Sequence, residues 1–337
     1  MVDYLSRRDA LRKILIDKAE SAVFLDPVSI RYLSGFSGSN AALLVGQDNN
    51  LDLLLTDSRY TQRAKDESPD IEVQIDREFS KQIHKQLESK SIKKIAIDST
   101  RMNIAQGEAL SNKDTFELVK IRELLAPLRS VKDEYEIKQI KKACAITADT
   151  LWFLINDLRP GMNEKQISNL LQEGFLKRGA DGLAFASIVA SGQNSATPHH
   201  EPTKRILERG DMVTIDCGAL VNGYHADMTR TVFIGTCADW QKDIYDLVMK
   251  AQEAGRKKLI AGAIAEEVDE ATRKIIRDAN YVAKDVKTKL SSGSCITVEP
   301  GIYLPGKGGV RIEDTCLVTE AEAEVLTPGS HEIICVA

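Results

Sequence analysis

The 337-residue chain is long enough for two domains, and its 43% apolar and 28% charged residues are typical of a soluble globular protein. A net charge of −5, without a long run of lysine or arginine, gives no reason to expect nucleic acid as a partner. No stretch approaches about 18 uncharged apolar residues, and residues 1–13 lack the apolar core of a signal peptide. The six cysteines show no CxxC spacing. We therefore expect a cytoplasmic protein with reduced thiols and no membrane span.

Strands and short helices alternate over residues 1–125, which predicts an N-terminal α/β domain with a largely covered sheet. The spacing of apolar residues predicts helices at 5–22, 58–67, 79–91 and 103–111. Apolar and β-branched runs predict strands at 22–25, 41–45, 51–56, 71–75, 92–98 and 116–121, of which the second and third form a hairpin. No glycine-rich phosphate loop follows any of these strands.

Residues 125–132 are interpreted as the join to a second domain, 126–337, because Pro127 interrupts the local pattern. A long helix follows and ends at Pro160-Gly161, and Asn163 can cap the next helix. The predicted elements are helices at 133–158, 164–178, 239–260 and 265–279, a strand at 184–190, and a polar loop at 191–202 that contains Pro198-His199-His200.

Residues 215–231 read IDCGALVNGYHADMTRT and predict a hairpin that carries two aspartates. Asn222-Gly223 is a strong signal for a two-residue turn, because both residues tolerate a positive φ. In that register Asp216 faces Thr229 and Asp227 faces Gly218. Both carboxylates then lie on one sheet face, roughly 7 Å apart at Cα, which suits one or two hard cations.

A second acidic hairpin is predicted at 297–315, where Glu299 and Glu313 flank a Pro-Gly-Lys-Gly-Gly turn. Val310 and Ile312 take one face of its second strand, and Arg311, Glu313 and Thr315 take the other. Two solvated surface hairpins are the alternative. We favour a shared site, because the acids interrupt apolar strands.

From residue 133 onward, the order helix, helix, acidic hairpin occurs twice, which predicts an internal repeat of two halves. Each half would contribute two acidic side chains to a site between them. The halves differ before their hairpins: the first has 32 residues at 180–211, whereas the second has only 14 at 281–294, without a clear strand or a histidine.

Four carboxylates without a cysteine favour a hard or borderline divalent cation, such as Mn²⁺, Co²⁺ or Zn²⁺. Two cations would balance the four negative charges. Two neighbouring cations can share a water and deprotonate it at neutral pH, so hydrolysis is the expected reaction.

At these residues the sequence resembles the creatinase/prolidase/aminopeptidase P family of pita-bread metallopeptidases. The acidic signature D-x-G…G-Y-x-x-D-x-T-R is matched by Asp216, Gly218, Gly223, Tyr224, Asp227, Thr229 and Arg230. E-P-G-x-Y is matched by residues 299–303, R-x-E-D by 311–314, and the proline–histidine loop by Pro198-His199. Residues 129–133 and 30–45 resemble the entry to the catalytic half and the family's N-terminal domain.

The resemblance implies an α/β (α+β) protein with a creatinase-like N-terminal domain and a pita-bread domain of two repeats. It implies cleavage of the Xaa–Pro bond in small peptides with proline second, through a hydroxide that bridges two divalent cations, and a homodimer. The implied metal ligands are Asp216, Asp227, Glu299 and Glu313, and the implied catalytic residues are His199 at the substrate, Glu299 in proton transfer and Arg311 in substrate positioning.

The chain departs from the family between residues 281 and 294, where a histidine ligand and a second substrate histidine belong. No histidine lies between His225 and His331. Either the protein lacks this segment or the printed sequence omits it, and a true deletion should leave a second cation weakly held or absent. The same deficit keeps open a catalytically impaired homologue that acts as a binding protein. A metal-free hydrolase is disfavoured, since it has no reason to keep four carboxylates together. His225, near Asp227, is a weaker candidate for a substitute ligand. His200 is expected to be a neighbour of His199 and not a participant, and His84 and His331 are expected at the surface.

Overall fold

The computed structural model describes residues 2–111, 115–279 and 289–336, and it divides into two compact units, Met1–Arg129 and Ser130–Ala337. The division lies four residues beyond the boundary expected from the sequence and falls inside a short helix, α6 (Ala126–Ser130). The sequence pattern suggested that Pro127 interrupts the local structure, but in the structure this residue lies within a helix. It lies in the first turn of α6, where a proline removes no intrahelical hydrogen bond.

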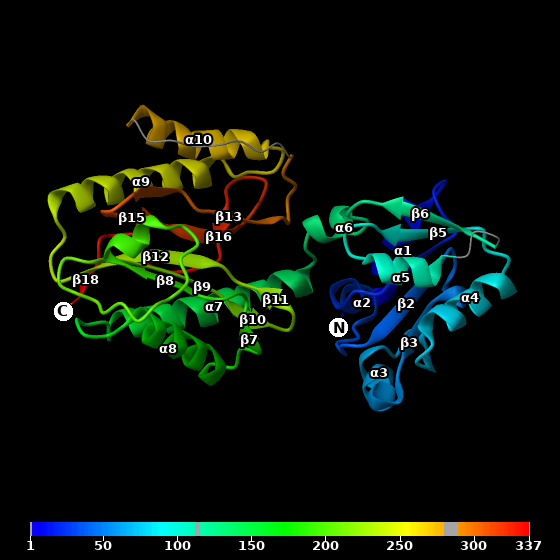
Figure 1. Cartoon of the computed structure of the whole chain (residues 1–337). Helices are drawn as coiled ribbons and strands as arrows, with labels where there is room; N and C mark the ends of the chain where they lie inside the picture. Colours follow the sequence, from blue (N-terminus) through cyan, green and yellow to red (C-terminus); the bar gives the residue numbers. More distant parts are fainter. Residues whose placement is uncertain (1, 112–114, 280–288, 337) are drawn as a thin grey trace. The chain divides into compact units, whose positions relative to one another are not determined.

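The first unit is built on a six-stranded sheet in the order β4-β3-β2-β1-β5-β6, with helices on both faces (Figure 1). Alternate residues of β1 point to opposite faces of the sheet. Phe24 packs in one apolar core with α1 and α2, and Val23 packs in another with α4 and α5. The elements are α1 (Tyr4–Leu15), β1 (Ser21–Phe24), α2 (Pro27–Ser34), β2 (Ala41–Gly46), β3 (Leu53–Thr56), α3 (Thr61–Glu67), β4 (Glu72–Ile75), α4 (Phe79–Ser89), β5 (Lys94–Asp98), α5 (Ile104–Leu110) and β6 (Glu117–Ile121).

Two helices of this unit differ from the sequence prediction. The helix expected at 5–22 ends at Leu15, because the chain turns through Asp17, whose φ is +63°. Helix α2 was not predicted, although its start carries a recognisable signal. The side chain of Asp26 accepts a hydrogen bond from the Ser29 amide, and Pro27 occupies the first helical position.

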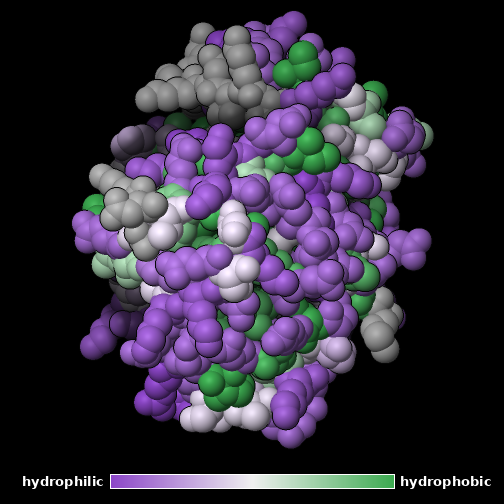
Figure 2. Space-filling view, turned by 90° about the vertical axis from the view of Figure 1, so that its right-hand side faces the viewer, coloured by the Kyte–Doolittle hydropathy of each residue, from purple (hydrophilic) through white to green (hydrophobic). Residues whose placement is uncertain are grey.

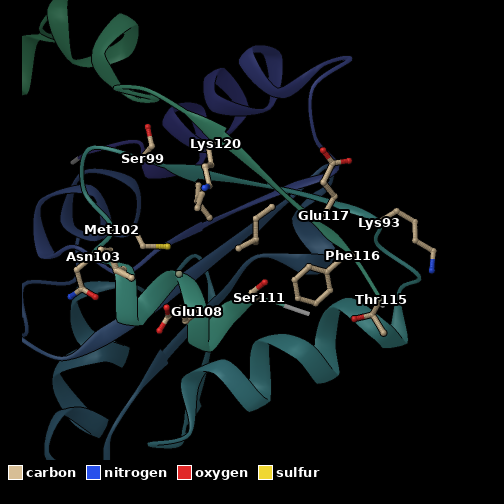
Figure 3. Close-up of a pocket in the computed structure, with 14 residues that line it drawn as sticks. Lys93, Ser99, Met102, Asn103, Glu108, Ser111, Thr115, Phe116, Glu117 and Lys120 are labelled. Atoms are coloured by element: carbon tan, nitrogen blue, oxygen red, sulfur yellow. The ribbon is translucent and has the colours of Figure 1, made fainter. Parts of the chain in front are cut away.

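A cavity of about 840 Å³ lies in the first unit between α5 and the β5–β6 edge of the sheet (Figure 3). Met102 and Phe116 point toward it from different sides, and Glu117 and Lys120 also line it. Among the described residues, the only group of three histidine, cysteine or acidic side chains close enough to share a cation lies in the second unit.

The second unit contains a seven-stranded sheet whose main path runs β13-β16-β12-β9-β8. Helices α7 and α8 form one pair and α9 and α10 form another, and the two pairs lie on either side of the strands in Figure 1. The strand expected at 184–190 is shorter, since β8 begins at Ile188. The elements are α7 (Glu134–Ile155), α8 (Glu164–Lys177), β7 (Gly182–Leu183), β8 (Ile188–Ser191), β9 (Met212–Cys217), β10 (Ala219–Val221), β11 (Tyr224–His225), β12 (Met228–Ile234), α9 (Asp239–Lys258), α10 (Ala265–Asp278), β13 (Cys295–Val298), β14 (Gly301–Leu304), β15 (Gly308–Arg311), β16 (Glu313–Leu317), β17 (Glu324–Val325) and β18 (Cys335–Val336).

The predicted internal repeat is visible in matching backbone contacts. Asn163, just before α8, forms an isolated bridge with Ile206, and Ile264, just before α10, forms the same bridge with Lys289. Two residues before each bridge lies a glycine with positive φ, whose amide donates to a leucine carbonyl downstream: Gly161 to Leu207 at 3.0 Å and Gly262 to Leu290 at 2.9 Å. The two halves therefore share one backbone pattern at the starts of α8 and α10.

The two halves diverge after these helices. The first half continues through β8, which pairs with β9 at the edge of the sheet. The unusual loop predicted between residues 281 and 294 lies largely outside the described residues, since the structure resumes at Lys289.

The face shown in Figure 2 is mostly hydrophilic, with hydrophobic side chains in small separate groups. Across the described parts of the chain, no helix combines the length and apolar character that crossing a bilayer requires.

Candidate metal centre

The first acidic hairpin has the predicted turn and register. Asn222 and Gly223 both have positive φ, +50° and +82°, as a two-residue primed turn requires. Leu220 pairs with His225, and farther from the turn Asp216 pairs with Thr229. The hairpin is divided between two sheets, because β10 and β11 join β7 whereas β9 and β12 belong to the seven-stranded sheet.

The second acidic hairpin joins the first directly, through antiparallel pairing of β12 with β16. Thr229 pairs with Glu313, so Asp216, Thr229 and Glu313 form a row across three adjacent strands. The Thr229 hydroxyl donates to Glu313 Oε2 at 2.6 Å, and the Thr315 hydroxyl donates to the Asp227 carbonyl at 2.8 Å. The two hairpins therefore meet at one site, as the repeat in the sequence predicted.

Three carboxylates converge at this site: oxygens of Asp216, Asp227 and Glu313 all lie within 4.8 Å of one another. Asp216 and Glu313 are 8% and 1% exposed. One oxygen of each group (Asp216 Oδ1, Asp227 Oδ1 and Glu313 Oε1) is buried and has no hydrogen-bond partner. Buried, unpartnered carboxylate oxygens that face one another are costly unless a cation or a proton lies between them. This donor set fits a hard divalent cation.

The pKa values of these groups reflect the same crowding. Burial raises the pKa of Asp227 to about 8, and the negative charges of Asp216 and Glu299 add to the effect. Burial and the charges of Asp227, Glu299 and Asp216 also raise the pKa of Glu313 well above its usual range. Burial raises the pKa of Asp216 too, against the opposing charge of Arg311. A divalent cation between the carboxylates would remove this repulsion and favour their ionised forms.

The other predicted ligand, Glu299, follows β13 and is exposed. It lies outside the compact group of three, and its Oε1 accepts a hydrogen bond of 3.0 Å from the Thr297 hydroxyl. Its charge nevertheless acts on Asp227 and Glu313, and it lines the same cavity as Asp216. Glu299 is therefore beside the three carboxylates rather than among them.

That cavity has a volume of about 590 Å³ and brings His199, Glu299 and Arg311 together with Asp216. His199 is exposed, whereas Arg311 is 5% exposed. Part of the wall is apolar and includes Leu259, Val268, Ile276, Leu290 and Ile296. An apolar cavity with a few convergent polar groups is the usual form of a small-molecule site.

Arg311, at the end of β15, links the carboxylates to the rest of the cavity. Its Nη2 donates to Asp216 Oδ2 at 2.5 Å, and its Nε donates to the Thr229 hydroxyl at 3.1 Å. Its Nη1 donates to the Tyr303 hydroxyl at 2.9 Å and to the Pro198 carbonyl at 3.1 Å. Sequence reasoning gave Tyr303 no role, although it lies in the E-P-G-x-Y motif, because its contact with Arg311 depends on the pairing of β14 with β15.

Two of the remaining histidines differ from expectation. His331 was expected at the surface, but its Nε2 donates a hydrogen bond of 2.6 Å to the Asp314 carboxylate. His200, expected to be only a neighbour of His199, contacts Glu164 Oε2 at 2.9 Å. His225 lies exposed on β11, where its ring is hydrogen-bonded to the backbone of Ala184, and it does not belong to the group of potential ligands.

Comparison with known families agrees with this geometry. The description "Metallopeptidase family M24" matches residues 138–287 and 278–320, and "Creatinase/Prolidase N-terminal domain" matches residues 7–131. The Xaa-Pro dipeptidase of Pyrococcus furiosus is 32% identical over 351 residues, which cover 97% of this chain and 99% of the relative. The chain belongs to metallopeptidase family M24.

Two solved structures show how far the likeness extends. The Xaa-Pro dipeptidase from Bacillus anthracis has a TM-score of 0.93 at 30% identity, covering 99% of this chain and 100% of that one. The X-Pro aminopeptidase from Thermotoga maritima has a TM-score of 0.89 at 33% identity, covering 98% and 100%. The predicted fold, a creatinase-type α/β domain followed by a pita-bread domain, is thereby confirmed. The M24 family depends on a dinuclear metal centre, and this chain has a buried group of two aspartates and one glutamate.

Proposed function

We propose that this protein is a metal-dependent exopeptidase that hydrolyses the Xaa–Pro bond of dipeptides or short peptides. The observation that carries the proposal is the set of three buried, unpartnered carboxylate oxygens beside a cavity lined by His199 and Arg311. The names of the relatives from Pyrococcus furiosus and Bacillus anthracis, both Xaa-Pro dipeptidases, support the choice of substrate.

Asp216, Asp227 and Glu313 would hold the cation, with Glu299 at the side of the group. Bound divalent cations of this kind lower the pKa of a water and polarise a carbonyl group. Because only the three clustered carboxylates offer compact ligation among the described residues, we expect one Mn²⁺, Co²⁺ or Zn²⁺ ion to be held well and a second weakly.

The protein's own groups would perform the remaining tasks. Glu299 is exposed to the cavity and can accept the proton of the attacking water and return it to the proline nitrogen, which leaves as an amine. His199 can donate a hydrogen bond to the oxygen that gains negative charge at the former carbonyl. Arg311, held by Asp216, Thr229 and Tyr303, presents a fixed positive charge to the substrate. The apolar wall suits a pyrrolidine ring.

The test is hydrolysis of Ala-Pro and Ala-Pro-Ala by the purified chain with added Mn²⁺, with Ala-Ala as the comparison substrate. We expect metal-stimulated cleavage that requires proline in the second position. His199→Ala should lower turnover by about 10²-fold and leave Mn²⁺ binding nearly unchanged, since His199 lies outside the group of three. Absence of metal-stimulated cleavage of any Xaa–Pro peptide would refute the proposal.

A second candidate function is a non-catalytic binding protein on the same fold. It is favoured by the sequence, which has no histidine between His225 and His331, and by the absence of a histidine from the ligand group in the described residues. Metal content separates the candidates: no bound cation at millimolar Mn²⁺ supports the binding protein. The predicted homodimer is tested independently by the molar mass of the protein, measured by light scattering during size-exclusion chromatography.

A further inference from the structure

The most heavily hydrogen-bonded carboxylate among the described residues lies outside the cavity. Glu164, the first residue of α8, is fully buried. Its Oε1 accepts from the Ser191 amide at 2.8 Å, the Ser191 hydroxyl at 2.7 Å and Asn194 Nδ2 at 3.0 Å. Its Oε2 accepts from the Thr203 amide at 2.9 Å and the Thr203 hydroxyl at 2.7 Å, and it contacts His200 Nε2 at 2.9 Å. These six contacts, from four residues, compensate for removing the negative charge from water.

These contacts hold both ends of one segment, residues 191–203, which we call the anchored loop. Oε1 binds its beginning and Oε2 binds its end. Between them, Pro198 and His199 line the cavity, and the Pro198 carbonyl accepts a hydrogen bond of 3.1 Å from Arg311 Nη1. The far side of the loop is also fixed, because the Gly309 amide on β15 donates to the Ser195 hydroxyl at 2.8 Å. Glu164 thus holds the anchored loop from the side away from the cavity, and the Pro198 carbonyl of the same loop contacts Arg311.

The internal repeat shows that this carboxylate is not required to start the helix. The matching bridges of Asn163 with Ile206 and of Ile264 with Lys289 make Ala265 the counterpart of Glu164. Helix α10, which begins with that alanine, has the same length of 14 residues as α8. The second half has no counterpart of the anchored loop in its sequence, since far fewer residues separate α10 from its hairpin. The buried carboxylate therefore occurs in the half that carries the loop.

We propose that Glu164 is a positioning residue for the reaction, which sets the places of His199 and the Pro198 carbonyl against Arg311 by clamping both ends of the anchored loop. The proposal rests on the function proposed above. Glu164 touches neither the cavity nor the three carboxylates, so its removal should alter turnover without altering the affinity for metal.

The decisive variant is Glu164→Gln, because the side chain keeps its size. Each carboxylate oxygen accepts a backbone N–H, one from Ser191 and one from Thr203. Glutamine in either orientation therefore places an NH₂ group against a backbone N–H, and one end of the loop is released. We expect kcat for Ala-Pro to fall by about 10–100-fold, the effect of a misplacement near 1 Å, with KM and Mn²⁺ affinity within about threefold of wild type.

Glu136→Gln is the matched control. Glu136 is also a buried glutamate in the first turn of a helix of the same unit, but its carboxylate accepts from the Asp133 amide and the Tyr224 hydroxyl. It controls for the general effect of removing a buried charge. If Glu164→Gln does not fold, His200→Ala removes one contact from the same clamp at a partly exposed position, and His200→Gln restores an N–H donor. We expect His200→Ala to lower kcat and His200→Gln to recover part of the loss.

Hydrogen exchange followed by mass spectrometry gives a readout that does not depend on activity. Peptides covering residues 191–203 should exchange faster in Glu164→Gln than in wild type or Glu136→Gln. If wild type cleaves no Xaa–Pro peptide, the proposed function fails, and unchanged exchange of the loop would then overturn the clamp as well. If wild type is active, a normal kcat in Glu164→Gln, or a loss of Mn²⁺ affinity that parallels the loss of kcat, would overturn the proposal.

Discussion

At the scale of single residues, the three clustered carboxylates are arranged to bind a ligand, and this arrangement lowers the stability of the metal-free protein. Burial raises the pKa values of Asp216, Asp227 and Glu313, and the negative charge of Asp216 repels the other two and raises their pKa values further. One oxygen of each group remains without a partner. Neutralising one of them should relieve this repulsion while weakening the metal site. Functional sites often show this opposition between stability and ligand binding.

We therefore predict opposite effects of Asp227→Asn with and without metal. The midpoint of thermal unfolding of the metal-free protein should rise by roughly 2–6 °C near pH 7. Folded wild type must there either protonate Asp227, whose pKa is about 8, or tolerate its repulsive charge, and the neutral amide requires neither. The rise that Mn²⁺ produces in wild type should largely disappear. Differential scanning calorimetry in EDTA and in Mn²⁺ measures both effects, and an undiminished Mn²⁺-induced rise would contradict the assignment of Asp227 as a ligand.

Glu164 gives a prediction for the pH dependence of stability. Burial raises its pKa, but the hydrogen bonds from His200, Thr203, Asn194 and Ser191 outweigh this and hold the pKa at about 2, below the ordinary 4.5. Ionised Glu164 therefore stabilises the folded state above about pH 4.5, and this contribution is lost as the pH falls toward 2. We expect the difference in unfolding free energy between wild type and Glu164→Gln to shrink on acidification from pH 7 to pH 3, by at most about 3 kcal/mol. Urea unfolding at several pH values measures it; a difference that grows on acidification would be the wrong sign.

At the scale of the elements, the turn at Asn222-Gly223 fixes the register that brings Asp216 and Asp227 onto one face. The φ of Gly223, +82°, is unfavourable for any residue with a Cβ. Gly223→Ala should lower the free energy of unfolding by about 1–2 kcal/mol. Gly107→Ala is the control, because Gly107 lies inside α5 with open space around it and should gain about 0.5–1 kcal/mol from the better helix former. Equal effects of the two substitutions would show that the turn does not require the glycine.

The turn also shows what the sequence could reveal about the site. Asn222-Gly223 determines the pairing of Asp216 with Thr229, and the alternation along 310–315 places Arg311 and Glu313 on the face opposite to the buried Val310 and Ile312. These are local patterns, and the structure confirms them. The repeat of helix, helix and hairpin predicted that both acidic hairpins meet.

Contacts that depend on packing between distant segments were not predictable in the same way. Glu164 reaches partners 27 to 39 residues away, and its own sequence context is that of an ordinary helix start. His331 reaches Asp314 only because the end of the chain returns to the sheet, where β18 pairs with β12. No spacing rule identifies such pairs from a single sequence, because the side chains meet through tertiary packing.

At the scale of the whole molecule, each unit has its own apolar cores. In the described residues, two core clusters consist of side chains from the first unit and three consist of side chains from the second. All three clustered carboxylates belong to the second unit. A ligand that binds only the folded form of a unit stabilises that unit by mass action.

We expect saturating Mn²⁺ to slow hydrogen exchange in the strands of the second unit, β9, β12 and β16, and to leave β1, β2 and β3 of the first unit unchanged. Mass spectrometry of the full chain with and without Mn²⁺ measures both sets of strands in one experiment. Equal slowing in both units would show that they unfold as one cooperative body.

The pairing of β12 with β16 has a consequence for the order of events during folding. The contact from Thr229 to Glu313 spans 84 residues, and the contact from Arg311 to Asp216 spans 95. Contacts of such separation form slowly, since a long loop must close before they stabilise the chain. A ribosome-bound chain that ends before residue 313 has the two aspartates but lacks their third partner. We therefore expect the cation to bind late in folding. It can stabilise only a chain in which the two halves of the second unit have already paired.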